Sequence, residues 1–304
     1  MVERADVVAA AHRIEGRVHR TPVLTSRTLD AMLGVELRFK CENFQRVGAF
    51  KMRGATNAVR SLSRDVEIVA THSSGNHGAA LALAAAEAGL SAIVVVPRDA
   101  RPSKRASIER YGAEIVDCEP TLADRESTLE EVCRRTGATF VPPYDDEHII
   151  AGAGTAALEL LEECPGLDQV WIPVGGGGLA AGTVAATDGA AEVVLAEPEL
   201  ACDAKLSLAR GVLHDALPPR TVADGLRTAL GRRNFAILRN AGVRVCLASE
   251  VDIRLWTGRI AEIMKIVVEP SAAVTLAAMA GNPGVAAGTV GVVLSGGNAP
   301  PEAP

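Results

Sequence analysis

Short runs of β-branched residues alternate with Ala- and Glu-rich stretches of helical length from Glu67 onward. This alternation is typical of βαβ units that build a parallel sheet. The first series of expected elements comprises strands at 68–71, 92–96, 114–116 and 139–141 and helices at 76–88, 102–111 and 122–135. The second series comprises strands at 169–174, 192–195 and 289–294 and helices at 155–163, after Gly178, at 252–264 and at 271–280. We therefore expect two α/β lobes.

Three glycine-rich turns, at 73–78, 175–178 and 295–298, follow expected strands. Ligands of parallel sheets collect at the carboxyl ends of strands. Four consecutive glycines at 175–178 before a helix expose backbone N–H groups that suit a phosphate, although a merely flexible turn is the alternative. No Lys follows them and the G-x-G-x-x-G spacing is missing, so the turn predicts a phosphate site and not a dinucleotide site.

Lys51 lies between Phe50 and Met52, in a stretch bounded by Gly48 and Gly54. A lysine with apolar neighbours is open to desolvation, which favours the neutral amine needed for Schiff-base chemistry. The alternative is a lysine whose stem lies along apolar surface at a helix start while its amine stays in water. The motifs that accompany Lys51 along the chain favour the first interpretation.

Composition excludes several classes of protein. The chain has 304 residues, 48% of them apolar and 22% charged, which is enough for a large core and excludes a disordered or collagen-like chain. A net charge of −6 and 3% aromatic residues argue against a nucleic-acid surface. Six widely separated cysteines without metal-ligand spacing indicate reduced thiols. No apolar run reaches membrane-spanning length, so we expect a cytoplasmic protein.

Four motifs in this order resemble the signature set of fold-type II pyridoxal-phosphate (PLP) enzymes, in the serine racemase and serine/threonine dehydratase branch. They are GAFKMRGA at 48–55, SSGNHG at 73–78, PVGGGGL at 173–179 and SGGN at 295–298. The resemblance runs from about Thr21 to Asn298 and implies a tryptophan synthase β-like α/β fold with the cofactor between two lobes. It implies a large PLP-binding domain at 1–67 and 146–304 and a small substrate-closing domain at 68–145.

The resemblance also implies the residues that bind PLP. Lys51 carries the cofactor and, once released by the substrate amine, removes the Cα proton. The remaining cofactor contacts that it implies are Gly175, Gly176, Gly177, Gly178 and the Leu179 N–H for the phosphate, Asn76 for the 3-hydroxyl, Phe50 and Glu269 for the ring, and Ser295 for the pyridine nitrogen. From the sequence alone, Glu269 is equally readable as a solvated glutamate at a helix start.

Substrate contacts follow from the same resemblance. Ser73, Ser74, Asn76, His77 and Arg125 are the residues that it assigns to the substrate. Ser74 matches the serine that faces the cofactor opposite Lys51 and acts as the second acid or base of a racemase, whereas a plain helix cap is its alternative. The alternative for His77 is a partly buried histidine without a role in binding. The alternative for Arg125 is a solvent-facing residue of a helix. Tyr144 stands where racemases often carry Asn.

A divalent cation is implied by the segment 197–203. In this resemblance the carboxylates of Glu197 and Asp203 and the carbonyl of Ala201 hold the ion. Hard oxygen ligands suit Mg²⁺, Mn²⁺ or Ca²⁺. The alternative is a solvated acidic loop.

The leading functional hypothesis is a PLP-dependent L-threonine/L-serine dehydratase, an ammonia-lyase that converts a small β-hydroxy amino acid to a 2-oxo acid and ammonia. One alternative is a serine or other amino-acid racemase that uses Lys51 and Ser74 as two bases. Arg125 motivates another, a threo-3-hydroxyaspartate ammonia-lyase. A protein of a different class, which binds a phosphate ligand without catalysis, is the last. Relatives in this branch suggest a homodimer, with no nucleic-acid or membrane partner.

Overall fold

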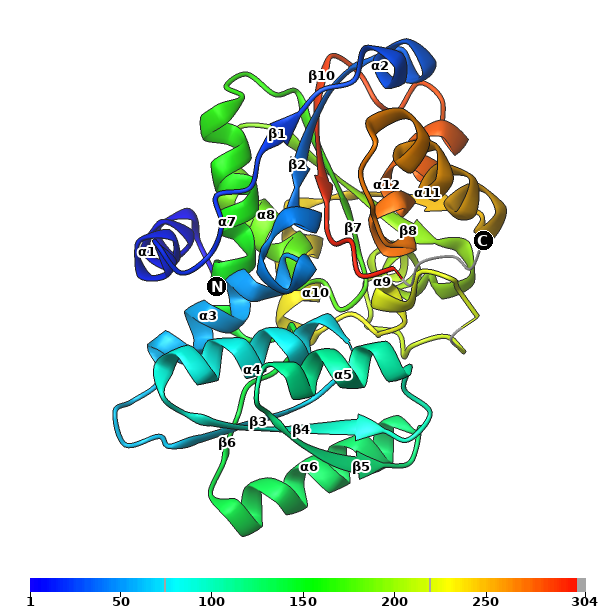
Figure 1. Ribbon diagram of the computed structural model, residues 1–304. Coiled ribbons are helices and arrows are strands. Elements are labelled where there is room, and N and C mark those ends of the chain that lie inside the picture. Colours follow the sequence, from blue (N-terminus) through cyan, green and yellow to red (C-terminus); the bar gives the residue numbers. More distant parts are fainter. Residues whose placement is uncertain (74, 219, 300–304) are drawn as a thin grey trace.

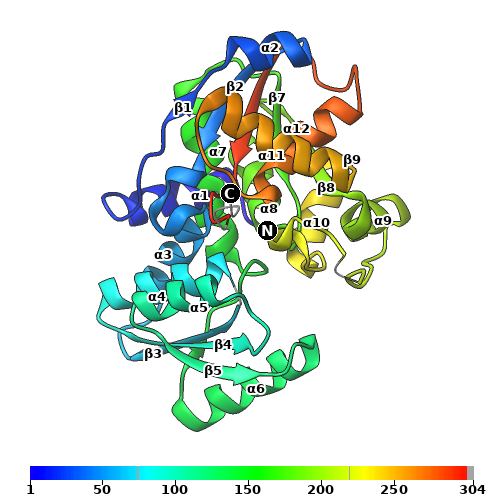
Figure 2. The ribbon, with the colours of Figure 1, turned by 45° about the vertical axis from the view of Figure 1, so that its right-hand side comes forward.

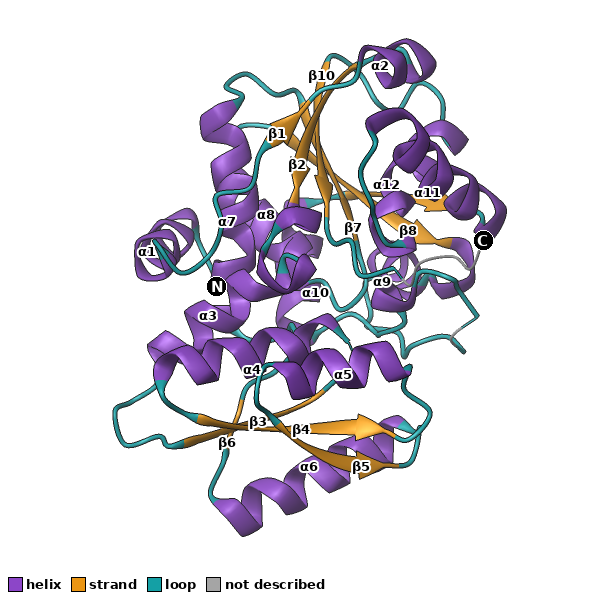
Figure 3. Ribbon diagram, viewed as in Figure 1, coloured by secondary structure: helices purple, strands orange, loops and turns teal. Residues whose placement is uncertain are grey.

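The computed structural model describes residues 1–73, 75–218 and 220–299, which form two sheets in two lobes (Figures 1 and 3). The larger sheet has the strand order β1-β2-β10-β7-β8-β9. Its strands are β1 (Val23–Leu24), β2 (Glu36–Cys41), β7 (Gln169–Pro173), β8 (Glu192–Pro198), β9 (Arg244–Ala248) and β10 (Thr289–Leu294). The short β1 pairs antiparallel to β2, and the other neighbours pair in parallel. Parallel pairing confirms the expected βαβ organisation.

The smaller sheet has the order β5-β4-β3-β6, with every neighbouring pair parallel. Its strands are β3 (Ile68–His72), β4 (Ser91–Pro97), β5 (Glu114–Cys118) and β6 (Thr139–Phe140). Three helices follow these strands, α4 (Asn76–Ala88), α5 (Pro102–Arg110) and α6 (Leu122–Thr136). In Figures 1 and 2, α4 and α5 lie on the side of this sheet that faces the large lobe, and α6 lies on the other.

Helices cover both faces of the large sheet. The helices α11 (Glu250–Met264) and α12 (Pro270–Gly281) pack together, with α12 against β7 to β10, and α7 (Glu147–Glu163) and α8 (Gly178–Thr187) cover the other face. The remaining helices of this lobe are α1 (Arg4–Ile14), α2 (Arg27–Leu33), α9 (Asp203–Arg210) and α10 (Arg232–Ala241). Two buried apolar clusters, one containing Trp171 and Trp256 and the other Ile172 and Leu195, form its core.

The helix α3 (Lys51–Ser61) lies between the two lobes. It packs against α7 of the large lobe and α4 of the small lobe. Its apolar residues Met52 and Val59 belong to the buried cluster that includes Val69 and Val94 of the small sheet. The predicted domain limits at 67 and 146 stay predictions, because α3 shares its packing between both sides.

Local signals explain why the repeating elements agree with expectation. The helix α4 ends at Gly89, which takes the left-handed conformation with φ 74°. Pro102 stands in the first turn of α5. Thr121 caps α6 by accepting a hydrogen bond from the Asp124 N–H. These signals lie within a few residues of the helix ends that they set.

The helix predicted at 155–163 begins earlier, at Glu147, so that expectation was wrong at its start. Asp146 caps it by accepting hydrogen bonds from the backbone N–H groups of His148 and Ile149. Gly152 and Gly154 interrupt the helical pattern in the first half of α7, so the sequence did not indicate a helix there. A Cβ atom on Gly154 would lie 2.5 Å from the Gly182 carbonyl oxygen, so these glycines allow α7 to pack closely on α8.

Several elements had no sequence prediction, namely α1, α2, β1, β2 and α3 before residue 67 and α9, α10 and β9 between 203 and 248. The omission of β2 matters most. This strand pairs in parallel with β10, which ends at the site. None of the described helices is both long enough and apolar enough to span a membrane.

Candidate active site

The three glycine-rich turns meet between the lobes, beyond the carboxyl ends of β3, β7 and β10. The turn before α3 is fastened to the turn after β10 by backbone contacts. Phe50 N–H donates to the Ser295 carbonyl at 3.0 Å, and Gly297 N–H donates to the Gly48 carbonyl at 2.9 Å. Lys51 is thereby held at the end of β10, which brings the first and fourth motifs together.

Lys51 begins α3, and its Nζ donates to the Pro143 carbonyl at 2.7 Å. The same Nζ lies 5.1 Å from the centroid of the Phe50 ring. Burial lowers the pKa of Lys51 to about 8, although the carboxylate of Glu269 acts in the opposite direction. A minority of this amine is therefore neutral near neutral pH, which is a far larger share than an unperturbed lysine would have.

The glycine loop after β7 needs glycine at each of its four positions. A Cβ atom on Gly175 would lie 2.9 Å from Leu226 Cα, and one on Gly176 would lie 2.3 Å from Tyr144 Cγ. Gly177 has φ +89°, and a Cβ on Gly178 would lie 3.0 Å from the Tyr144 carbonyl oxygen.

The same loop starts α8, whose cap Gly177 provides no side-chain hydrogen bond. The first N–H groups of the helix, that of Leu179 included, consequently have no intrahelical partner. A phosphate fits this backbone cradle, which combines free N–H groups with the positive end of the helix dipole.

Two residues that sequence reasoning left out of the predicted site support this loop. The Asn234 side chain donates to the carbonyls of Gly176 at 2.7 Å and Tyr144 at 3.2 Å. The Tyr144 ring lies against the loop, with its centroid 6.0 Å from Lys51 Nζ. Asn234 gave no signal in the sequence, because its partners are at least 58 residues away.

The helix α4 presents a second free N-terminus to the same space. Its cap, Gly75, contributes no side-chain hydrogen bond to the helix, and Gly75 N–H itself donates to the Ser73 hydroxyl at 3.2 Å. The N–H groups at this helix start suit a carboxylate. Ser74, the predicted second base, lies outside the described residues.

Asn76 joins the second and fourth motifs to Glu269. Its Nδ2 donates to both carboxylate oxygens of Glu269, at 3.0 and 3.1 Å, and its Oδ1 accepts from Asn298 Nδ2 at 3.0 Å. Glu269 is only 4% exposed, so the solvated alternative was wrong. Burial raises its pKa to about 7, while the Asn76 hydrogen bond acts in the opposite direction.

His77 is buried on the first turn of α4, with Nε2 3.2 Å from the Val141 carbonyl oxygen. Burial and the neighbouring Lys51 lower the pKa of His77 to about 3. The carbonyl neighbour requires the proton on Nε2, and the lowered pKa leaves Nδ1 without a proton, so the ring is neutral at working pH. Its side chain therefore offers no positive charge to a substrate, and the backbone N–H is what this position supplies.

Arg125 lies in the first turn of α6 and is partly buried. Its Nε has a long contact of 3.4 Å to the Thr121 carbonyl, and it forms no ion pair with any described residue. Burial lowers the pKa of His72 most, and the charge of Arg125 lowers it further. Burial raises the pKa of Tyr144, and the charge of Arg125 acts in the opposite direction. The charge of Arg125 therefore acts on His72 and Tyr144, although Glu126 opposes it at His72.

The predicted cation ligands are buried together on β8 and the start of α9. Glu197 is 1% exposed and Asp203 is 3% exposed. Their oxygens accept backbone hydrogen bonds from Ala204, Lys205 and Leu230, and neither forms an ion pair with a described side chain. Described residues form no group of three or more His, Cys, Asp and Glu side chains, so a cation here would need the Ala201 carbonyl as well. The alternative of a solvated loop was wrong for both carboxylates.

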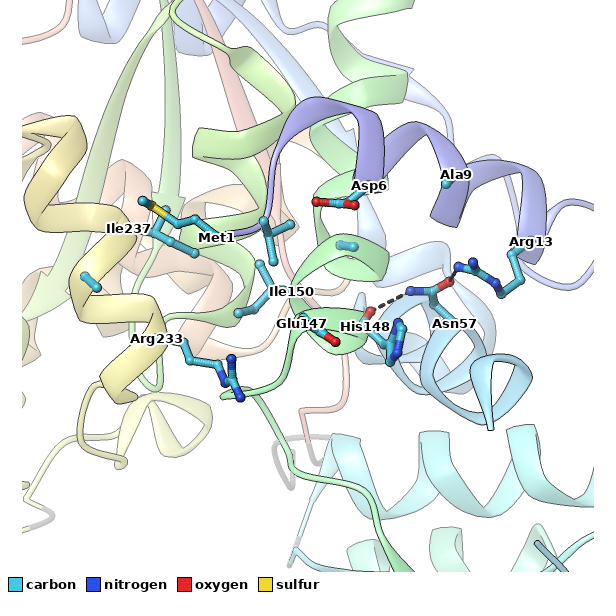
Figure 4. Close-up of a pocket in the computed structure, with 13 residues that line it drawn as sticks. Met1, Asp6, Ala9, Arg13, Asn57, Glu147, His148, Ile150, Arg233 and Ile237 are labelled. Atoms are coloured by element: carbon cyan, nitrogen blue, oxygen red, sulfur yellow. Dashed lines mark hydrogen bonds between the residues drawn. The ribbon is translucent and has the colours of Figure 1, made fainter. Parts of the chain in front are cut away.

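A separate cavity of about 430 Å³ lies between α1, α7 and α10 (Figure 4). Asn57 joins its walls, accepting from the Arg13 guanidinium at 2.6 Å and donating to the His148 carbonyl at 2.7 Å. None of the predicted site residues lines it. The cavity is therefore distinct from the space where the three glycine turns meet.

The sequence is similar to known proteins of one family. The profile of the family described as "Pyridoxal-phosphate dependent enzyme" matches residues 14–296. The chain is 44% identical to beta-hydroxyaspartate dehydratase of Paracoccus denitrificans, over 96% of this chain and 95% of the relative. It is 42% identical to serine racemase of Homo sapiens, over 97% and 90%.

Solved structures give the same result. A threonine deaminase from T.th. superposes with a TM-score of 0.94 at 40% identity, covering 98% of this chain and 99% of that one. Serine racemase of Dictyostelium discoideum gives a TM-score of 0.92 at 40% identity, covering 98% and 99%. With its lysine, its phosphate cradle and these relatives, the chain belongs to the fold-type II pyridoxal-phosphate dependent enzymes.

Proposed function

We propose that this enzyme is a dehydratase that eliminates water from a small β-hydroxy amino acid and releases a 2-oxo acid and ammonia. The observation that carries the proposal is the position of Lys51 among the three glycine turns, with its pKa lowered to about 8 by burial. A partly neutral amine at this point can accept a proton from a bound substrate.

The described residues fit PLP. Gly175 to Gly178 and the Leu179 N–H would hold its phosphate, Asn76 and Phe50 would contact its ring system, and Ser295 and Glu269 would lie near the ring. When bound, PLP supplies an electron sink for the bond that breaks at Cα. A hydroxyl at Ser295 cannot stabilise a protonated ring nitrogen as a carboxylate would, which favours prompt loss of the β-hydroxyl over a long-lived carbanion.

Groups of the protein itself bind the substrate and transfer its protons. The free N–H groups at the start of α4, with Ser73 and Asn76, orient the substrate carboxylate. Lys51 takes the Cα proton and returns it to the departing β-hydroxyl, which leaves as water. The resulting enamine becomes an imine, which water hydrolyses to the 2-oxo acid and ammonia.

Oxo-acid release tests this function directly. Purified enzyme with PLP and Mg²⁺ is given L-serine, D-serine, L-threonine and L-threo-3-hydroxyaspartate, and the remaining amino acid is resolved by chirality. Oxo acid from an L-hydroxy amino acid supports the dehydratase. Inverted amino acid with little oxo acid supports the racemase instead, with Ser74 as the predicted second base. If an enzyme with intact cofactor absorbance yields neither product from any of the four, the proposal is wrong.

An acidic substrate is the second candidate. The observation that favours it is Arg125, which forms no ion pair with a described residue and whose charge acts on Tyr144. The relative from Paracoccus denitrificans is named for beta-hydroxyaspartate. A preference for L-threo-3-hydroxyaspartate that Arg125→Ala leaves unaltered would remove this motive.

Attachment of PLP to the apo-enzyme should depend on pH through Lys51. The neutral amine is the reactive form, so the rate of covalent attachment should rise with pH through a midpoint near 8. An unperturbed lysine would give a midpoint near 10.4. The growth of cofactor absorbance after mixing at a series of pH values measures the rate. A midpoint above 10 would show that Lys51 is not desolvated.

A divalent cation at Glu197, Ala201 and Asp203 is part of the proposal. Two carboxylates buried without a cationic partner fit hard cations such as Mg²⁺, Mn²⁺ or Ca²⁺. Saturating Mg²⁺ should stabilise the chelator-treated protein, by about 2.7 kcal/mol when its concentration is 100 times the dissociation constant.

Thermal unfolding with and without Mg²⁺ measures this effect. Asp203→Asn should remove the stabilisation, whereas Glu199→Gln, at an exposed position of the same segment, should keep it. Equal responses in the two variants would refute the site. The homodimer and the cytoplasmic location stay predictions.

A further inference from the structure

An ion pair joins the lobes beside the turn that starts α4. Lys104 Nζ, on α5 of the small lobe, pairs with Asp224 Oδ2 in the 3₁₀-helix η4 (Asp224–Leu226) of the large lobe. The partners are 120 residues apart in the sequence. Their side chains are 19% and 16% exposed, so water screens this pair less than an exposed one.

On the small-lobe side, Lys104 stands beside the turn that starts α4. Its Nζ would lie 3.4 Å from a Cβ atom at Gly75, the cap of the helix N-terminus assigned above to the substrate carboxylate. Movement of Lys104 would therefore displace the backbone around Gly75, which is proposed to bind the substrate carboxylate.

On the large-lobe side, η4 touches two parts of the cofactor site. Leu226 Cα would lie 2.9 Å from a Cβ at Gly175, so η4 forms one wall of the phosphate cradle. Gly225 N–H donates to the Ser271 hydroxyl at 3.0 Å, which ties η4 to the start of α12 next to Glu269. The pair thus links the carboxylate-binding turn with the phosphate cradle.

Both charges also act on Glu269. Asp224 raises the pKa of Glu269 and Lys104 lowers it, in addition to the larger effects of burial and the Asn76 hydrogen bond. The other groups that face Glu269 are the backbone at Asn298 and the amine of Lys51. The two charges of the ion pair therefore act in opposite directions on this carboxyl group.

We propose that Lys104 and Asp224 are a positioning pair for the elimination reaction, holding the small lobe's substrate turn against the phosphate cradle. The inference rests on the proposed function. Neither residue needs to touch the reacting atoms, because each acts through groups that do.

Single and double variants test the pair. Lys104→Met and Asp224→Asn should each raise KM, by about 3- to 10-fold, and the double variant should lose no more than either single variant because one interaction is removed in all three. Amide hydrogen exchange in α5 should accelerate in all three. Arg105→Met is the matched control, since Arg105 lies on the same helix as Lys104 but pairs with Asp117 of β5, within the small lobe. In this variant KM should change less than about twofold.

The pH profile supplies a readout that loss of packing alone would not move. Glu269 would lie near the cofactor ring, so we expect its ionisation to affect kcat. Lys104→Met leaves Asp224 uncompensated, so the kcat midpoint that follows Glu269 should move to higher pH. Asp224→Asn leaves Lys104 uncompensated, so the midpoint should move to lower pH. In the double variant it should return towards the wild-type value, because both charges are gone.

Additive losses in KM, or midpoints that move in the same direction or stay in place, would overturn the proposal. If Lys104→Met fails to fold, Lys104→Arg serves instead, and it should keep both KM and the midpoint near wild type. Failure of the pair and failure of the proposed function are distinguishable. Oxo-acid formation by the wild-type enzyme tests the function, and the variants are compared only with that wild-type rate.

Discussion

Replacing Lys51 with Ala is expected to remove the visible absorbance of covalently bound PLP and to lower turnover by at least about 10³-fold. The amine has two roles in the proposed reaction, as the attachment point of the cofactor and as the base for the Cα proton. Lys51 is fixed at this point because Phe50 N–H donates to the Ser295 carbonyl and Lys51 Nζ donates to the Pro143 carbonyl. Absorbance spectra and oxo-acid release, measured on the same preparation, check both effects.

Lys265 provides the control for Lys51. It is exposed at the end of α11 with φ 60°, a conformation that Asn also tolerates, so Lys265→Asn should keep absorbance and turnover. Borohydride reduction followed by peptide mass spectrometry should place the cofactor on Lys51 in the wild-type protein. Full activity of Lys51→Ala would contradict the whole assignment of the site.

The second large effect concerns stability and comes from Arg53, two residues after Lys51. Its guanidinium is fully buried and makes paired hydrogen bonds to Glu42, at 2.7 and 2.8 Å, and to Glu159, at 2.7 and 2.9 Å. Arg53→Met keeps similar bulk but leaves Glu42 buried without its cation. The free energy of unfolding should fall by about 3–5 kcal/mol, measured by urea denaturation.

Arg38→Met is the control, because the Arg38–Glu36 pair is partly exposed and should contribute about 0–1 kcal/mol. The double variant Arg53→Met with Glu42→Gln should recover part of the loss, since it no longer leaves an uncompensated buried carboxylate. A loss below about 1 kcal/mol for Arg53→Met would mean that water or another cation reaches Glu42.

Much of the fold could be predicted because its signals are local. The strand and helix series of the small lobe follows from alternating apolar runs and from caps such as Gly89 and Thr121. The start of α7 escaped prediction, since Gly152 and Gly154 break a helical pattern that only close packing against Arg53 and Gly182 explains. The strand β2 was missed as well, and its place beside β10 depends on a partner about 250 residues away.

Candidate site residues divide in a similar way. Lys51, the glycine loop and Asn76 stand in contiguous motifs, so their residue types and order indicated PLP before any geometry was known. Asn234 and Tyr144, which support the glycine loop, lie in none of these motifs, and Tyr144 was noted only as a departure from the racemases. Their contribution comes from contacts between elements that the motifs do not contain.

The amino-acid sequence by itself determined the alternation that builds two parallel sheets, the four motifs and, through them, the membership in a PLP-dependent family. Only the tertiary structure decided that Glu269 is buried, that the Lys51 pKa falls to about 8, and that Lys104 meets Asp224 across the two lobes. The physical reason is that desolvation and ion pairing depend on every atom packed around a group. Most of those atoms belong to residues far away along the chain.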